Sequence, residues 1–209
     1  MPVAWDNDNP TDAQQLARNV RSVLHQIVAE AADRRSPSIA MAQQWHRDLY
    51  RNIELPVDYY AGEIRDSDPN FPELFGYEVA VGEHLGVISA EVPAALATFE
   101  TAVTDAVAVV DDHLLDREAT ADGAELYVTL AAVSHGEWIR IHPFANGNRR
   151  TARIWTHWVA ARYDLPPLMR VKPRPDDRMF GIAAKASMTG NHTPMRAWLL
   201  DQFFGGSQF

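Results

Sequence analysis

The sequence contains no cysteine among its 209 residues. Without a thiol the chain can form no disulfide framework, thiolate zinc site, iron–sulfur cluster or cysteine nucleophile. It has no internal repeat or low-complexity tract, and its eight histidines show no HExxH or similar ligand spacing. We therefore expect an ordinary globular protein whose chemistry rests on other side chains.

Long apolar runs are also absent. No stretch approaches the roughly 20 apolar residues that a membrane span needs. The first ten residues, MPVAWDNDNP, lack the basic start and apolar middle of a secretory signal. The apolar fraction of 46% and the charged fraction of 22% are typical of a soluble globular protein. We expect no membrane association, and the cytoplasm is the simplest location.

An excess of positive charge is lacking too, since the net charge is −9. This balance argues against a protein that binds nucleic acid over its whole surface. The distribution is uneven: residues 140–196 hold 11 Lys/Arg and three acids, a local charge of +8, which leaves −17 for the rest. We interpret this segment as an anion site, although single arginines in it can instead pair with acids elsewhere in the fold.

The hydrophobic spacing predicts a mainly α-helical protein. Apolar residues recur at helical intervals in seven segments: 11–33, 39–51, 92–115, 124–141, 149–163, 176–188 and 194–204. Residues 57–90 are instead rich in glycine and proline, and Tyr77, Val79 and Val81 alternate as in a strand, which predicts a small β-hairpin or lid. We expect residues 1–10 to form a loose, flexible tail and residues 116–123 a polar loop.

The most informative segment is HPFANGNRRTAR, residues 142–153, which joins one predicted helix to the next. Its GN pair tolerates the unusual backbone angles of such a turn. A helix N-terminus binds anions through its free N–H groups and its dipole. Arg149, Arg150 and Arg153 follow in the first turn, where cations are unfavourable unless an anion is bound. Arginine matches phosphate oxygens, and His142 can transfer protons near neutral pH, so the pattern indicates transfer of a phosphorus-containing group to a hydroxyl.

This segment resembles the signature of the Fic/Doc (Fido) family, HPFx(D/E)GN(G/K)RxxR. The preceding EWIRI, residues 137–141, resembles the helix that leads into the signature, and AGEIR, residues 61–65, resembles the start of the family's substrate-positioning flap. The resemblance implies a mainly α Fido fold, a helical bundle in one domain (residues 11–209) with a small β-hairpin flap at about 61–82. It implies that the flap binds the backbone of a target protein by strand addition.

The resemblance also implies roles for individual residues. His142 would be the general base that activates a Ser, Thr or Tyr hydroxyl of the target protein, which then receives AMP from ATP with the help of Mg²⁺. The nucleotide would be bound by Gly147, Asn148, Arg149, Arg150, Arg153 and Phe180. Gly147 and Asn148 would form an anion hole from their backbone and the amide side chain, and the two later arginines would hold phosphates. Phe180 would flank the base, or be an ordinary core residue.

Two positions depart from the family pattern. Asn146 stands where an acidic residue normally binds magnesium, so its amide oxygen would hold the ion more weakly. Arg149 stands where AMP-transferring members have glycine, and it is more similar to the lysine of the Doc-like branch, which transfers the γ-phosphate. Three activities therefore stay open: AMP transfer, Doc-like protein phosphotransfer, and a non-catalytic regulatory module that binds phosphate or nucleotide.

A further family feature is missing. Many members carry an inhibitory helix with the pattern (S/T)xxxE(G/N), but no glutamate in this sequence is followed by glycine or asparagine. Two explanations are open. Inhibition comes from a separate antitoxin-like partner, as in a toxin–antitoxin pair, or the altered signature makes inhibition unnecessary.

Overall fold

Seven α-helices and one short hairpin make up the computed structural model, which describes residues 3–6, 8–115 and 121–205. The helices are α1 (Ala13–Ala32), α2 (Ile39–Leu49), α3 (Val92–Leu115), α4 (Ala121–Ile141), α5 (Asn148–Arg162), α6 (Arg178–Ser187) and α7 (Thr193–Phe204). Short 3₁₀ turns lie at Pro10–Asp12, Asp58–Tyr60, Pro72–Leu74 and Ser89–Glu91. The mainly α fold with a small hairpin is confirmed.

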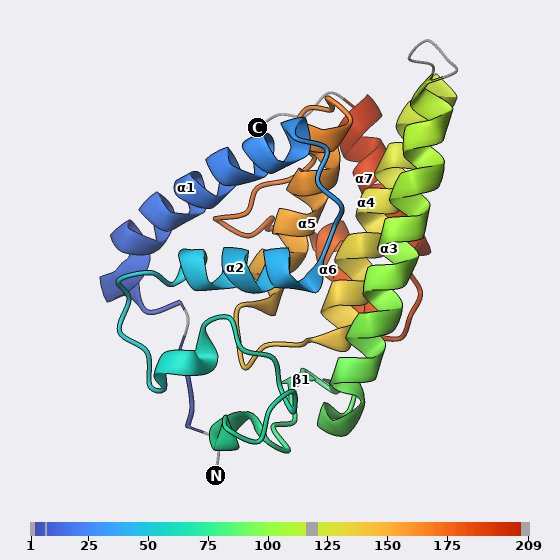
Figure 1. Ribbon diagram of the computed structural model, residues 1–209. Helices are drawn as coiled ribbons and strands as arrows, with labels where there is room; N and C mark the ends of the chain where they lie inside the picture. Colours follow the sequence, from blue (N-terminus) through green and yellow to red (C-terminus); the bar gives the residue numbers. More distant parts are fainter. Residues whose placement is uncertain (1–2, 7, 116–120, 206–209) are drawn as a thin grey trace.

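The helix α5 occupies the centre of the bundle (Figure 1). It packs against α4, α1 and α2, while α3 lies along α4 and α7 covers α4 from a further side. Figure 1 shows α3 and α4 side by side as two long helices at one edge of the molecule. The chain turns directly from α4 into α5, and the first residue of α5, Asn148, is buried.

Aromatic side chains form the middle of the core. Trp155 on α5 contacts Trp45 of α2 at a ring-centroid distance of 4.9 Å and Phe99 of α3 at 5.4 Å. It also contacts Trp138 of α4 at 5.8 Å, and Trp138 lies 5.7 Å from Phe144 in the α4–α5 turn. These rings bury large areas of apolar surface and meet at mostly tilted or edge-on angles, which aromatic pairs favour. One ring on α5 therefore joins three other helices, and a second carries the contact on to the turn.

The hairpin is smaller than the sequence indicates and extends further along the chain. Strand β1 (Ala80–Val81) pairs antiparallel with β2 (His84–Leu85), with Ala80 opposite Leu85 and Val81 opposite His84. Gly82 supplies the left-handed turn at φ 63°. The second strand thus lies beyond the predicted limit of residue 82, and two residues are too few to show an alternation. The helix α4 begins at Ala121, three residues before the predicted 124, and residues 116–120 of the predicted loop lie outside the described residues.

The N-terminal segment differs from the predicted loose tail. Trp5 is 8% exposed and packs against Tyr50 and Tyr60 at ring-centroid distances of 4.6 and 6.1 Å. The amide of Val3 donates to the hydroxyl of Tyr60 at 3.1 Å. Burial of the Trp5 ring stabilises this position of the segment. The ring's partners, His46, Tyr50 and Tyr60, are 41 or more positions away, so local composition gives no sign of these contacts.

One stretch, Ser89–Asp112, is long and apolar enough to cross a membrane by length and composition, with a mean hydropathy of 1.3. Within it Phe99, Val103 and Val107 are buried, at the spacing of a helix with one face in the core. The packing of α3 along α4 accounts for this apolar stripe.

We predict that Trp155→Ala lowers the free energy of unfolding by about 3–5 kcal/mol, the usual cost of a cavity left by a large core aromatic. Trp155→Phe should cost clearly less, because Nε1 of Trp155 has no hydrogen-bond partner among the described residues. Urea unfolding at 25 °C, followed by circular dichroism, measures both. A loss below about 1 kcal/mol for the alanine variant would contradict the central role of this ring.

Candidate active site

The turn between α4 and α5 is held in one shape by its own asparagine. The Oδ1 of Asn148 accepts from the amide of Phe144 at 2.9 Å, and its Nδ2 donates to the Phe144 carbonyl at 2.8 Å. Asn148 is 1% exposed. Its side chain therefore closes the turn, while Asn148 also lines the cavity described below; its predicted part in an anion hole stays a prediction. Its backbone N–H and that of Arg149 have no hydrogen-bond acceptor among the described residues, so the helix start can still bind an anion.

Gly147 is required by both conformation and space. Its φ is 76°, and a Cβ atom there would lie 2.5 Å from Oη of Tyr50 and 2.6 Å from Nε2 of His46. His46 itself accepts from the Gly62 amide through Nδ1 at 2.9 Å, donates through Nε2 to the Asn146 carbonyl at 3.0 Å, and stacks on Phe144 at 3.9 Å. Sequence reasoning did not predict a role for His46. The one sequence feature that relates it to the site is its position on α2, four residues before Tyr50, which caps that helix.

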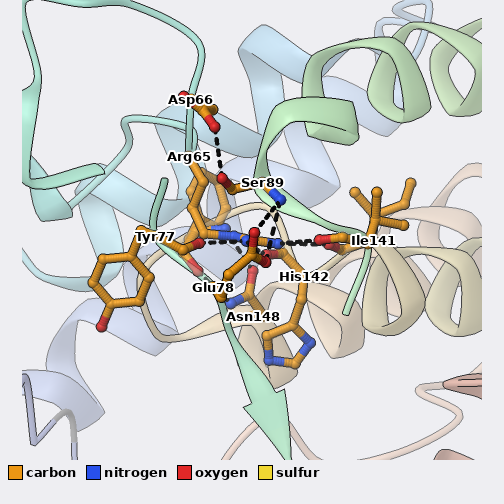
Figure 2. Close-up of polar contacts among 10 residues, drawn as sticks. Arg65, Asp66, Tyr77, Glu78, Ser89, Ile141, His142 and Asn148 are labelled. Carbon is orange, nitrogen blue, oxygen red and sulfur yellow. Dashed lines mark hydrogen bonds and ion pairs between the residues drawn. The ribbon is translucent and has the colours of Figure 1, made fainter. Parts of the chain in front are cut away.

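His142 has the geometry of a proton acceptor. Its backbone is left-handed, with φ 54°, and its Nδ1 donates to the Ile139 carbonyl at 2.8 Å. A carbonyl only accepts, so Nε2 carries the lone pair. Figure 2 shows the ring extending away from the polar contacts that hold its backbone. Burial lowers the pKa of His142 to about 4; the bond to Ile139 opposes this shift, and the positive charges of Arg65 and Arg149 add to it.

The predicted site residues of the turn share one cavity of about 400 Å³. His142, Asn146, Gly147, Asn148, Arg149, Arg150 and Arg153 all line it, together with Asp8, Val79, Ala80, Val81, Ala145, Lys172, Pro173 and Arg174. Five of these side chains are cationic, and one described lining residue, Asp8, is acidic. Lys172 and Arg174 were not predicted individually, although they belong to the basic segment 140–196.

The arginines at this cavity have few counter-charges. Arg153 is 4% exposed, and its Nε donates to the Val171 carbonyl at 2.9 Å. Burial, and then the neighbouring guanidiniums of Arg150, Arg149 and Arg174, lower the pKa of Arg153 to about 9, so it remains charged at neutral pH. Buried like charges are costly unless an anion joins them. A multiply charged anion such as a phosphate chain would relieve this repulsion.

The N-terminal segment reaches into the same cavity. The carboxylate of Asp8 forms an ion pair with the buried Arg150, and lies 3.7 Å from Nζ of Lys172. Arg150 also donates to the Tyr50 hydroxyl at 2.8 Å. The Asp8 carboxylate therefore occupies one of the two arginines expected to hold phosphate.

The predicted magnesium ligand does not fit that role in the described structure. The Oδ1 of Asn146 accepts from the Gly147 amide at 2.9 Å, and its Nδ2 donates to the Trp5 carbonyl at 2.7 Å. Among the described residues no group of three or more His, Asp or Glu side chains could hold a metal ion. Mg²⁺ is usually bound by one or two carboxylates together with substrate phosphates, and the acidic residue among the described cavity lining, Asp8, is paired with Arg150. At the predicted ligand position the described structure therefore has a neutral amide oxygen that already accepts a hydrogen bond.

A second cavity of about 430 Å³ adjoins the basic one and shares Val81, Arg149, Arg153 and Arg174 with it. Phe180 lines this cavity but is 3% exposed and packs on Trp198 at 5.0 Å. Phe180 is therefore a core side chain that also forms part of the wall of this cavity, and its role beside a nucleotide base stays a prediction. The rest of the lining combines apolar residues such as Ile139 and Met188 with the polar residues His84, His135, Glu83 and Lys185.

Solved Fic-domain structures share this fold at low identity. A Fic domain containing signaling protein from Bacteroides thetaiotaomicron gives a TM-score of 0.55 at 21% identity, over 88% of this chain and 65% of that one. BepC of Bartonella tribocorum, solved with bound AMPPNP, gives 0.56 at 16% over 96% and 91%. The N-terminal FIC domain of Bep8 from Bartonella sp. 1-1C gives 0.59 at 13% over 97% and 91%. The fold is that of a Fic domain, and the chain spans about two thirds of the Bacteroides protein.

The family follows from the sequence itself. The Fic/DOC family profile matches residues 37–160, more than half of the chain. The protein therefore belongs to the Fic/DOC family. No curated protein matches the chain.

We predict that the His142 ring stays neutral, protonated on Nδ1, from pH 8 down to about pH 5. Because burial disfavours the cation, the proton binds only as the pH falls toward about 4. The ¹⁵N and ¹³Cε1 shifts of the ring, assigned with a His142→Gln variant, report both tautomer and charge. A midpoint near 6.5 would show that the ring is not desolvated.

We predict that Asp8→Asn raises the affinity for ATP by roughly two- to fivefold, because an exposed carboxylate no longer competes with phosphate for Arg150. Asp6→Asn is the matched control, since it removes one negative charge from the same segment, where the Asp6 carboxylate accepts from the Asp8 amide at 3.1 Å. Isothermal titration calorimetry at low salt measures both. If the two variants raise the affinity equally, the change in net charge explains the effect and competition for Arg150 does not.

Proposed function

We propose that this protein transfers AMP from ATP to a Ser, Thr or Tyr hydroxyl of a target protein, with His142 as the general base. The observation that carries the proposal is the position of His142 Nε2: Nδ1 is bonded to the Ile139 carbonyl, no described residue bonds Nε2, and the ring lines the basic cavity. Family membership and the BepC structure with AMPPNP support a nucleotide as the ligand.

The two cavities match the two parts of a nucleotide. The larger, less polar cavity beside Phe180 would take the nucleoside, and the basic cavity at the start of α5 would take the phosphates. Arg149 and Arg153 line both, so they would lie where the two parts join. The α-phosphate would therefore bind beside the helix N-terminus, within the same cavity as His142.

The reaction would proceed by in-line displacement at the α-phosphorus. The target hydroxyl gives its proton to Nε2 of His142 as its oxygen forms a bond to the α-phosphorus. The bond to the β-phosphate bridging oxygen breaks, and pyrophosphate leaves. The guanidiniums of Arg150 and Arg153 and the free N–H groups of α5 would stabilise the charge that builds on the phosphates. The carbonyl of Ile139 would stabilise the imidazolium that forms, as a proton acceptor for Nδ1.

The target would lie along the flap, whose β1 residues Ala80 and Val81 border the basic cavity. An extended segment added to this edge would deliver its hydroxyl toward His142 by main-chain bonding. Since ATP and protein hydroxyls are abundant in the cytoplasm, we place the reaction there. The inhibitor would be a separate protein, or the Asp8 carboxylate would limit nucleotide binding on its own.

A second candidate, transfer of the γ-phosphate, is favoured by one residue. Arg149 is exposed at the start of α5 and lines both cavities. A cation there would bind terminal phosphates that a glycine would leave free, and so would favour a reversed nucleotide. A third candidate is a module that binds nucleotide without turnover. It is supported by the bonds that Asn146 and Arg150 already make within the protein, to the Trp5 carbonyl and the Asp8 carboxylate.

The deciding experiment is incubation of the protein with Mg²⁺ and a bacterial lysate, using ATP labelled at the α-phosphate in one reaction and at the γ-phosphate in another. AMP transfer predicts protein-bound α-label that falls roughly 100-fold or more in His142→Ala. His25→Ala, at an exposed position of α1, should leave the label unchanged.

Label from the γ-position alone would move the protein to the phosphotransfer branch, and Arg149→Gly should then depress the signal. Absence of both labels, in a protein that binds ATP by calorimetry, would favour the non-catalytic module.

A further inference from the structure

Arg65 is a fully buried cation outside the basic cavity. Its side chain is 0% exposed, and its guanidinium donates to four backbone carbonyls. The acceptors are His142 at 2.9 Å, Ile141 at 3.1 Å, Tyr77 at 2.5 Å and Val87 at 3.0 Å. Figure 2 shows the side chain in the middle of these contacts. A buried guanidinium with so many neutral acceptors fixes its neighbours, because each carbonyl would otherwise lose its partner.

The four acceptors come from two different parts of the site. Ile141 and His142 open the turn that carries the general base, whereas Tyr77 and Val87 flank the β1–β2 hairpin on either side. The backbone amide of Arg65 also donates to the Pro143 carbonyl at 2.9 Å. One residue thus binds three consecutive carbonyls of the turn and both ends of the hairpin segment.

The same two parts touch directly. The amide of Val87 donates to the Arg140 carbonyl at 3.1 Å. At Gly86 a Cβ atom would lie 3.0 Å from Cβ of His142 and 3.5 Å from the Ile141 carbonyl. The chain leaving β2 is therefore packed against the base of the His142 side chain, and a shift of one segment moves the other.

Acidic residues around Arg65 provide its counter-charge. Glu78 Oε2 lies 3.8 Å from Nη1 of Arg65, and the same carboxylate accepts from the Ser89 amide at 3.0 and 3.2 Å. The Ser89 hydroxyl donates to Asp66 Oδ2 at 2.6 Å. Burial lowers the pKa of Arg65 to about 10, against the effect of Glu78 and Asp66, so the guanidinium stays charged at neutral pH. A permanent, planar, multiply donating group is what this set of acceptors requires.

We infer that Arg65 is a positioning residue that sets the distance between the flap and the general base. Arg65 Nε holds the carbonyl of His142 in its left-handed conformation, Ile139 holds the ring through Nδ1, and the other guanidinium nitrogens hold the two ends of the hairpin. The inference rests on the proposed function in one respect, namely that the flap carries the target hydroxyl. Arg65 touches neither cavity, so it should act on the transfer step without acting on nucleotide binding.

The test compares Arg65→Lys with wild type in the full chain. Lysine keeps the charge but has one nitrogen, which cannot span carbonyls on both the turn and the hairpin. Arg162→Lys is the matched control: Arg162 is also buried, donates to the Arg35 carbonyl at 2.9 Å and pairs with Asp111, but sits at the far end of α5. Three quantities are measured: ATP affinity, the ring shifts of His142, and label transfer at saturating ATP.

For Arg65→Lys we expect ATP affinity within twofold of wild type, displaced His142 ring signals, and a maximal transfer rate roughly ten- to a hundredfold lower, the range that a small misplacement of a reacting group costs. For Arg162→Lys we expect wild-type His142 signals and rate. If Arg65→Lys leaves the His142 signals in place, or if Arg162→Lys displaces them equally, the inference is overturned.

Two further readouts keep the test decisive. If Arg65→Lys does not fold, Glu78→Gln replaces it: this half-exposed side chain keeps an oxygen for Ser89 but removes the charge beside Arg65, and unmoved His142 signals would overturn the inference. If wild type transfers no label at all, the proposed function fails, whereas the His142 shifts in Arg65→Lys still decide the positioning role.

Discussion

The structure depends on keeping two guanidiniums buried beside a helix N-terminus. The dipole of α5 and the cations around it all repel Arg150 and Arg153, so other parts of the chain must compensate. The Tyr50 hydroxyl and Asp8 do so for Arg150, and the Val171 carbonyl does so for Arg153. The compensation is incomplete, because one carboxylate faces five cationic side chains in the cavity. A polyanion that entered this site would therefore stabilise the protein by reducing the repulsion among its cations.

The core explains how so polar a turn is held in place. Its anchor, Phe144, lies between the His46 ring at 3.9 Å and the Trp138 ring at 5.7 Å, and Trp138 in turn contacts the central Trp155. The Asn148 side chain closes the turn from inside. Ring packing from α2, α4 and α5 therefore supports a turn that lines a charged cavity. Because His142 lies two residues before Phe144, the packing of these tryptophans helps to position it.

The sequence was sufficient for the fold class and for the part of the site that is contiguous in the chain. His142 to Arg153 lie in one turn and the start of one helix, and the predicted site residues among them line one cavity. Asp8, His46 and Arg65 could not be found in this way. Their partners are 142, 100 and 77 positions away, and such pairings arise from tertiary packing, which no local period encodes.

The Asn148 side chain shows a different limit. The sequence motif marks this residue for a ligand, but an amide side chain can bond to its own loop as well, and in the structure it bonds to both backbone polar groups of Phe144. The same ambiguity applies to Phe180, which is buried and lines a cavity at once. Residue type predicts which bonds a side chain is able to form. The geometry of the fold decides which of the competing partners it bonds to.

The attachment of Asp8 to the chain has a quantitative consequence. A carboxylate tethered a few residues before α1 is present at a fixed effective concentration, whatever the amount of protein. Dilution, which separates two different proteins, does not separate Asp8 from Arg150. If the proposed function holds, competition between nucleotide phosphate and Asp8 for Arg150 would depend on the free nucleotide concentration and the ionic strength, and would be the same whether the protein is scarce or abundant.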